Sequence, residues 1–237
     1  MSGVVGIYRV KNEERWIGES LERTLLIVDR IILFDDHSTD STREIARSMK
    51  NVTVVESPFS GLDEARDKDH LLSLVLPLNP DWIVQLDGDE VLSGRAVEET
   101  RTWVGQKNRG GLLFFRIAYL WDRTDQERVD GVFKNFCRPR AYSIFDQNTT
   151  RFSYRRTRFG GHFHCGQVPQ GHTGQRIHMK YPIKHYGYLD NEDRERKYKW
   201  YNANDPNNKA EGGYLHILAK PNHHAPGPVE FVSFDDI

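Results

Sequence analysis

The sequence predicts an α/β fold with a mostly parallel central sheet and helices on both faces. In the first half, short apolar runs alternate with stretches of helical periodicity, which is typical of strand–helix–strand units. Residues 30–34 are apolar after the initial arginine, as expected for a strand buried on both faces. The second half, from about residue 119, has poor periodicity and predicts a smaller, irregular antiparallel region.

The strands of the first half are expected where short apolar runs lie between polar segments. These runs are residues 4–8, 30–34, 51–55, 81–86 and 111–117.

Helices are expected between these strands. Apolar residues near helical spacing predict a first helix over residues 14–28. The second begins at Asp40 or Ser41, and Ser41 with Glu44 fits a capping box. The third covers residues 63–76 and stops at Pro77, and the fourth covers residues 93–107 with Ser93 as its cap.

The second half offers fewer signals. Short antiparallel strands and loops are expected over residues 119–183, followed by a charged helix over residues 190–201. Residues 221–237 are expected to form a tail or an extended segment that wraps over the domain.

Composition narrows the class of protein. The chain has 237 residues, with 38% hydrophobic and 28% charged, which suits one soluble globular domain with elaborations. Its formal net charge of -1 argues against a nucleic-acid partner. The two cysteines, Cys137 and Cys165, form no disulfide pattern, so a reducing cytoplasm is the expected compartment. We expect no signal peptide and no membrane-spanning segment, so an enzyme with a lipid acceptor would visit the membrane surface.

Acidic residues follow two of the predicted strands. Asp35 to Asp40 come after the second strand, and Asp87 to Glu90 come after the fourth. In parallel sheets ligands bind beyond the carboxyl ends of the strands. Asp87 and Asp89 are two apart, so in an extended segment they point to the same side, where their oxygens suit Mg²⁺ or Mn²⁺. A solvated acidic turn is the plainer interpretation of the second segment, and a turn with a helix cap that of the first.

Taken together, the two acidic segments resemble those of the family-2 glycosyltransferases, which have the GT-A fold. The resemblance covers about the first 120 residues. It continues weakly to residues 183–188, which look like the HYGY segment of a subgroup that includes lipopolysaccharide-core transferases. The matching segments, in the order of the family, are residues 10–14, 31–42 and 81–90.

The resemblance implies a role for each matching residue. Asp36 matches the aspartate that contacts the nucleotide base, and Asp87, Gly88 and Asp89 match the metal and donor motif. His185 is a candidate third ligand, and an imidazole suits Mn²⁺. The remaining donor contacts implied are Tyr8, Arg9, Lys11, Arg66 and Lys68. A solvated helix face is the alternative for Arg66 and Lys68.

The implied activity is an inverting, metal-dependent transfer of a sugar from a nucleotide-sugar, with UDP the expected nucleotide and Mn²⁺ or Mg²⁺ the metal. The acceptor would be a hydroxyl of a glycan or of a lipid-linked or protein-linked group. A base must take the acceptor proton, and Asp130 and Asp122 are the first candidates on chemical grounds. The other candidates are His164, His162, Asp125 and Glu127. In the subgroup that this sequence resembles, a His-Glu pair often follows the arginine-containing strand. The nearest counterpart here is His164-Cys165, which lacks the glutamate and leaves the base open.

The resemblance also implies a division of the chain. Residues 1–118 would bind the nucleotide-sugar, residues 119–205 would form the acceptor-side and catalytic half, and residues 206–237 a C-terminal extension. The alternatives are a sugar nucleotidyltransferase, whose usual glycine-rich loop is absent after the first strand, and a non-catalytic nucleotide- or sugar-binding module. Trp121, beside Asp122, is a candidate for stacking on an acceptor sugar.

Overall fold

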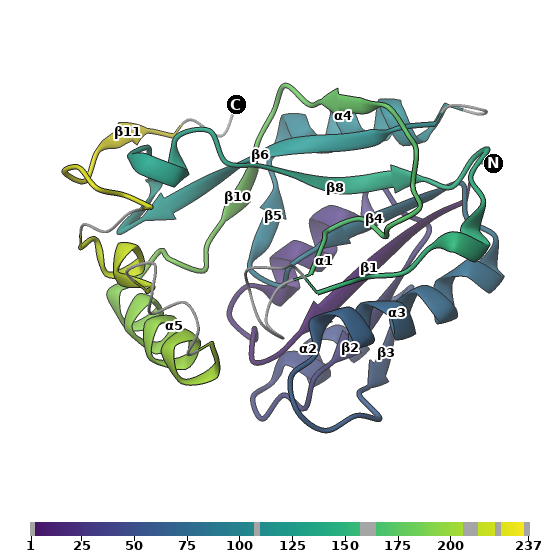
Figure 1. Ribbon diagram of the computed structural model, residues 1–237, viewed down its shortest axis with the longest axis horizontal. Helices are drawn as coiled ribbons and strands as arrows, with labels where there is room; N and C mark the ends of the chain where they lie inside the picture. The colour runs from purple at the N-terminus through teal and green to yellow at the C-terminus, as the bar shows by residue number, and fades with distance from the viewer. Residues whose placement is uncertain (1–2, 107–109, 157–164, 206–212, 221–223, 235–237) are drawn as a thin grey trace.

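The fold of the protein is an α/β sheet with helices on both faces (Figure 1). The computed structural model describes residues 3–106, 110–156, 165–205, 213–220 and 224–234. The main path of the sheet runs β11-β7-β6-β8-β4-β1-β2-β3. The strands are β1 (Val4–Val10), β2 (Arg30–Asp35), β3 (Val52–Glu56), β4 (Trp82–Leu86), β5 (Glu90–Leu92), β6 (Leu112–Trp121), β7 (Arg123–Arg128), β8 (Cys137–Ser143), β9 (Arg176–His178), β10 (Ile183–His185) and β11 (Phe231–Ser233).

The helices cover the two faces of the parallel strands β4, β1, β2 and β3. Side chains of α1 and α4 pack in the core on one face, and those of α3 pack on the other. In Figure 1, α3 crosses in front of these strands and α1 lies behind them. The helices are α1 (Ile17–Leu25), α2 (Thr42–Ser48), α3 (Glu64–Val75), α4 (Gly94–Val104) and α5 (Asn191–Asn204), with short 3-10 turns η1 (Leu76–Leu78), η2 (Gly131–Phe133), η3 (Thr149–Arg151) and η5 (Leu215–Leu218).

The strands and helices predicted for the first half occur in the predicted order, with one added short strand, β5, and two further local differences. The first helix is shorter than residues 14–28, because the chain makes a hydrogen-bonded turn at Glu13 before it enters α1. The capping box at Ser41 does not form. Asp40 takes that role, and its carboxylate accepts hydrogen bonds from the backbone and hydroxyl of Thr42 at 3.0 and 2.5 Å. Ser93 caps α4 as predicted and accepts from the amide of Ala96 at 3.3 Å.

The second half builds onto the parallel strands through β8, which runs antiparallel between β4 and β6. Strand β6 continues through residue 118, so the two predicted halves share one strand. Of the C-terminal segment, for which a tail or a wrap was expected, β11 pairs antiparallel with β7. Among the described residues, none of the helices has the length and apolar character needed to cross a membrane.

Alternate side chains of β1 point to opposite faces of the sheet, and this decides the role of Tyr8. Val5 and Ile7 lie in the core under α3, whereas Tyr8 lies on the α1 side and is 0% exposed. The Tyr8 hydroxyl shares hydrogen bonds with the hydroxyls of Ser20 and Thr24 at 2.9 and 2.7 Å. The side chain of Tyr8 is therefore a core residue and not the nucleotide contact implied by the resemblance.

We expect Tyr8→Phe to lower the free energy of unfolding by about 1–3 kcal/mol, because the buried hydroxyls of Ser20 and Thr24 each lose a hydrogen-bond partner. Urea denaturation of the wild type and the variant measures this difference. An unchanged unfolding midpoint would contradict the buried network.

Candidate active site

The two acidic segments lie along the same edge of the parallel sheet, as predicted. Strand β1 pairs with β2 up to Val10–Asp35 and with β4 up to Tyr8–Leu86. The three strands are parallel, so the residues after Asp35 and after Leu86 leave the sheet at its carboxyl edge. The two segments are separated by β1 alone, which is about 10 Å across two strand spacings.

Asp36 is held by basic side chains of β1 and of the residue after it. Arg9 donates to Asp36 Oδ2 at 2.9 Å and, through Nε, to Asp67 Oδ2 at 2.9 Å. Lys11 Nζ lies 3.8 Å from the same oxygen of Asp36 and is more exposed. Arg9 and Lys11 therefore both contact Asp36, and Arg9 also connects it to α3. Their contact with a nucleotide stays a prediction.

Asp87 and Glu90 share one arginine that the sequence analysis did not identify. Arg140 donates to Asp87 Oδ2 at 2.7 Å and also to Glu90. The pairing of β6 with β8 skips Arg140, because Leu113 faces Ala141 and the next residue of β6 faces Pro139. Such a bulge turns a side chain out of the regular strand pattern. The bulge directs the Arg140 guanidinium to the acidic motif.

Asp89 forms its own ion pair, with Lys197 of α5, whose ammonium donates to Asp89 Oδ2. His185 Nε2 lies 3.6 Å from the same oxygen. The antiparallel pairing of β10 with β5 sets His185 opposite Glu90, so the structure brings this predicted residue to the acidic motif. The His185 ring lies against Tyr119, with ring centroids 4.6 Å apart.

Burial and charge set the protonation of this cluster. Burial raises the pKa of Asp89, but Lys197 and His185 outweigh it and hold the pKa well below its usual range. Burial lowers the pKa of His185 to about 4, so its imidazole is neutral near pH 7. Burial raises the pKa of Glu90 and of Glu13 to about 8, against the opposing charges of Arg140 and Lys197 respectively.

The predicted metal ligands do not form a metal shell in this structure. Asp87 is paired with Arg140, and Asp89 is paired with Lys197, so both carboxylates already carry a cation from the chain. Within the described ranges, no group of three or more His, Cys, Asp or Glu side chains is arranged to hold a metal ion. The residues present therefore do not fit a divalent ion unless Lys197 leaves Asp89.

Gly88 and the two basic residues of α3 have structural contacts. A Cβ on Gly88 would lie 2.8 Å from Glu13 Cγ, so the glycine allows close packing between the acidic motif and the start of α1. Arg66 is engaged with Asp67 and with the carbonyls of residues 60 and 61. Lys68 is buried and pairs with Glu64 at 2.7 Å. Burial raises the pKa of Asp87, but the charges of Arg140 and then of Lys68 outweigh it and lower that pKa. Lys68 thus stabilises the charged form of Asp87. Arg66 stabilises the loop before α3 through its hydrogen bonds to the two carbonyls.

The predicted bases are in different surroundings. Asp130 is closed in a two-pronged pair with Arg128 at 2.6 and 2.8 Å, and its side chain is 5% exposed, so it has no free oxygen for an acceptor. The Asp122 carboxylate is 55% exposed and accepts from Arg194 at 2.7 Å on one oxygen only. His162 and His164 lie outside the described residues. Trp121 is buried between Arg128 and Arg194, so it packs in the core and does not face an acceptor.

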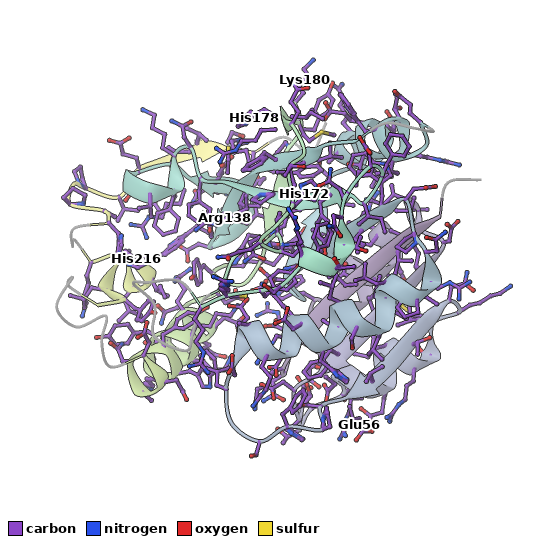
Figure 2. The ribbon with its side chains drawn as sticks, turned by 45° about the vertical axis from the view of Figure 1, so that its right-hand side comes forward. Glu56, Arg138, His172, His178, Lys180 and His216 are labelled. Atoms are coloured by element: carbon purple, nitrogen blue, oxygen red, sulfur yellow. The ribbon has the colours of Figure 1, made fainter. Side chains whose placement is uncertain are left out.

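Arg138 is a further cation near the motif. It precedes Arg140 by two positions on β8, and its guanidinium stacks over Phe136 at 4.0 Å. Burial lowers the pKa of Arg138, and the nearby Asp87 acts in the opposite direction. Figure 2 shows Arg138 in the middle of the molecule, with His216 of η5 to one side of it. In the part of the chain that the structure describes, Arg138 forms no ion pair.

Comparison with known sequences gives the family. A sequence model described as "Glycosyl transferase family 2" matches residues 7–168. The chain belongs to glycosyl transferase family 2. An uncharacterized glycosyltransferase of Rickettsia felis is 28% identical over 144 residues, which is 60% of this chain and 45% of the relative. One of Rickettsia typhi is 29% identical over 110 residues, or 46% of this chain and 36% of the relative. This family-2 chain thus spans less than half the length of these relatives.

Solved structures agree on the fold of the family-2 chain. Residues 1–349 of TarS from S. aureus match with a TM-score of 0.52 and 13% identity, over 92% of this chain and 69% of that one. The same TarS segment in complex with UDP-GlcNAc matches with a TM-score of 0.53 and 13% identity, over 77% of this chain and 58% of that one. At this identity the likeness shows the GT-A type of fold and nothing finer.

Gly187 allows the Asp89–Lys197 pair to close, because a Cβ at this position would overlap the Asp89 carboxylate and the Lys197 ammonium. We expect Gly187→Ala to cost about 1–3 kcal/mol through overpacking. In a chain of this size each kcal/mol lowers Tm by about 2–4 °C, which calorimetry resolves.

Gly94→Ala is the matched control, since a Cβ on this first residue of α4 meets nothing within 4 Å. Equal melting temperatures of the two variants would show that the pair does not need the glycine.

Proposed function

We propose that the protein is an inverting glycosyltransferase that moves a sugar from a UDP-sugar to a hydroxyl acceptor. The observation that carries this proposal is the meeting of Asp36 and the Asp87-Gly88-Asp89-Glu90 motif at one edge of the parallel sheet. Ligands of such sheets bind at this edge, where the loops after the strands converge. Family membership and the complex of TarS with UDP-GlcNAc support a nucleotide-sugar donor.

The nucleoside is proposed to lie across the end of β1. Asp36 accepts hydrogen bonds from the base, and Asp87 from the ribose. Arg9 and Lys11 both contact Asp36, and we propose that they give up part of this contact to bind the incoming nucleotide. Because these carboxylates follow strands β2 and β4, the proposed base and ribose contacts start from strands about 10 Å apart.

The diphosphate then lies toward the second acidic segment, where the cations gather. Arg140 is fixed by Asp87, by Glu90 and by the side-chain oxygen of Gln167 at 2.9 Å. Arg138 is more exposed on the same strand. Fixed positive groups stabilise the charge that develops on a leaving diphosphate, because they need no reorganisation during the reaction.

Inversion requires the acceptor oxygen to attack the sugar carbon from the side opposite the leaving diphosphate. We propose Asp122 as the base that takes the acceptor proton, in preference to Asp130. Asp122 pairs with Arg194, and Asp89 pairs with Lys197. The two basic residues are three positions apart in α5, so they lie on the same face of the helix. The two ion pairs therefore connect Asp122 and Asp89 to adjacent turns of one helix.

The test of donor binding is a screen of nucleotide-sugars for slow hydrolysis, followed by the affinity of the purified chain for UDP. Release of UDP from one sugar donor supports the proposal, and the absence of turnover and binding with every nucleotide contradicts it. Each measurement is made in EDTA and again with Mn²⁺, so the metal expected from the sequence is tested in parallel.

We expect Asp36→Ala to weaken UDP binding at least about tenfold, or about 1.4 kcal/mol, since a charged hydrogen-bond partner of the base is lost. Isothermal titration calorimetry measures the Kd. Glu98→Ala, which removes an exposed carboxylate on α4, is the control and keeps the wild-type Kd. Equal affinities of all three proteins would refute the assignment of Asp36.

A further inference from the structure

The Lys197 ammonium lies against the acidic motif, in the place where a bound cation would neutralise its charge. Its ammonium donates to Asp89 Oδ2, and its side chain is 11% exposed beside a carboxylate of 6% exposure. A lysine this buried is seldom found without a paired charge. In Figure 1, α5 lies on the left of the sheet, on the side toward which the parallel strands run.

The helix that carries Lys197 is anchored one turn earlier. Arg194 is buried and donates to the carbonyls of Tyr188 and Leu189 at 2.9 and 2.8 Å, in addition to its pair with Asp122. Because Arg194 and Lys197 share a face, this anchor also sets the position of the Lys197 stem. A side chain at Gly187 would overlap the Lys197 ammonium, so the absence of a side chain there leaves room for the Asp89–Lys197 pair.

A divalent ion and Lys197 compete for the same oxygen. An ion on Asp89 Oδ2 and His185 Nε2, which lie 3.6 Å apart, would meet the ammonium that already contacts that oxygen. Two like charges at contact distance in a partly buried site repel by several kcal/mol. Asp87 also carries a cation of the chain, because Arg140 donates to its Oδ2.

We propose that Lys197 is the resident cation of the donor diphosphate and that the protein binds UDP without a divalent ion. An ammonium has three N–H donors, so one can stay on Asp89 while the others reach phosphate oxygens. This inference rests on the proposed function, because it assumes that the site binds a nucleotide diphosphate.

In the reaction, the bond from the sugar carbon to the β-phosphate oxygen breaks, and its electron pair stays on that oxygen. The acceptor oxygen forms the new bond to the sugar carbon and gives its proton to Asp122. Lys197 remains protonated throughout and offsets the charge that gathers on the leaving UDP. No oxidant, reductant or further reactant is needed.

The test compares UDP binding by the wild type, Lys197→Met and Lys199→Met in excess EDTA and again with Mn²⁺. Methionine keeps the length of the stem without the charge. We expect the wild type to bind UDP in EDTA with a Kd within about threefold of its value in Mn²⁺. Lys197→Met should lose at least about tenfold in EDTA. Lys199, exposed on the same helix, is the matched control and should leave the Kd unchanged.

The inference is overturned if the wild type binds UDP only with Mn²⁺, or if Lys197→Met binds in EDTA as the wild type does. These comparisons separate it from the proposed function, which fails together with the inference only if the wild type binds no UDP under either condition. The wild-type comparison stands even if Lys197→Met does not fold, which circular dichroism checks.

Binding of Mn²⁺ alone gives a second readout without nucleotide. Electron paramagnetic resonance of free Mn²⁺ should show at least about tenfold tighter binding to Lys197→Met than to the wild type, because Asp89 and His185 are then open to the ion. Adding Asp89→Asn should remove this gain. Tighter Mn²⁺ binding to the wild type than to Lys197→Met would overturn the inference.

Discussion

The pairing of strand-end carboxylates with cations from the second half of the chain is the interaction on which the rest of the structure depends. Asp87 and Asp89 follow a fully buried strand, and moving a carboxylate out of water costs several kcal/mol unless a charge compensates it. Arg140 and Lys197 supply that charge. The bulge in β8 and the anchored position of α5 both serve to bring these cations to the edge of the sheet.

The same constraint explains how the irregular half is organised around the regular one. Strand β10 lies between β5 and β6 and carries His185 to the acidic motif, after which the chain turns at Gly187 and enters α5. Helix α5 then spans from Asp122 at the end of β6 to Asp89, with one basic side chain for each. The residue that follows β6 is thereby linked to the acidic motif by a single helix.

The fold of the first half could be predicted because the apolar runs, the helical periodicity and the helix caps all indicate the same strands and helices. Buried parallel strands are continuous in apolar residues, and caps such as Ser93 mark the helices between them. The shared edge of Asp36 and Asp87 follows from parallel strands alone. The resemblance assigned Tyr8 to the nucleotide because of its position along the chain. The alternation of side chains in β1 instead directs Tyr8 into the core on the α1 face.

Two cations of the site, Arg140 and Lys197, could not be predicted, each for a physical reason. Arg140 reaches Asp87 only because a bulge breaks the two-residue alternation of β8, and no local sequence pattern specifies that bulge. Lys197 belongs to a helix whose charged residues are distributed all around it, so periodicity does not single out one lysine. Long-range pairs of this kind depend on tertiary structure, which brings residues more than a hundred positions apart into contact.

The most direct measurement of the central claim is a crystal structure of the full chain with UDP, grown in EDTA. The account predicts uracil beside Asp36 and diphosphate oxygens within about 2.7–3.2 Å of Lys197 Nζ, with no metal between them. UDP bound away from the carboxyl edge of β1, β2 and β4, or a diphosphate out of reach of Lys197, would contradict it.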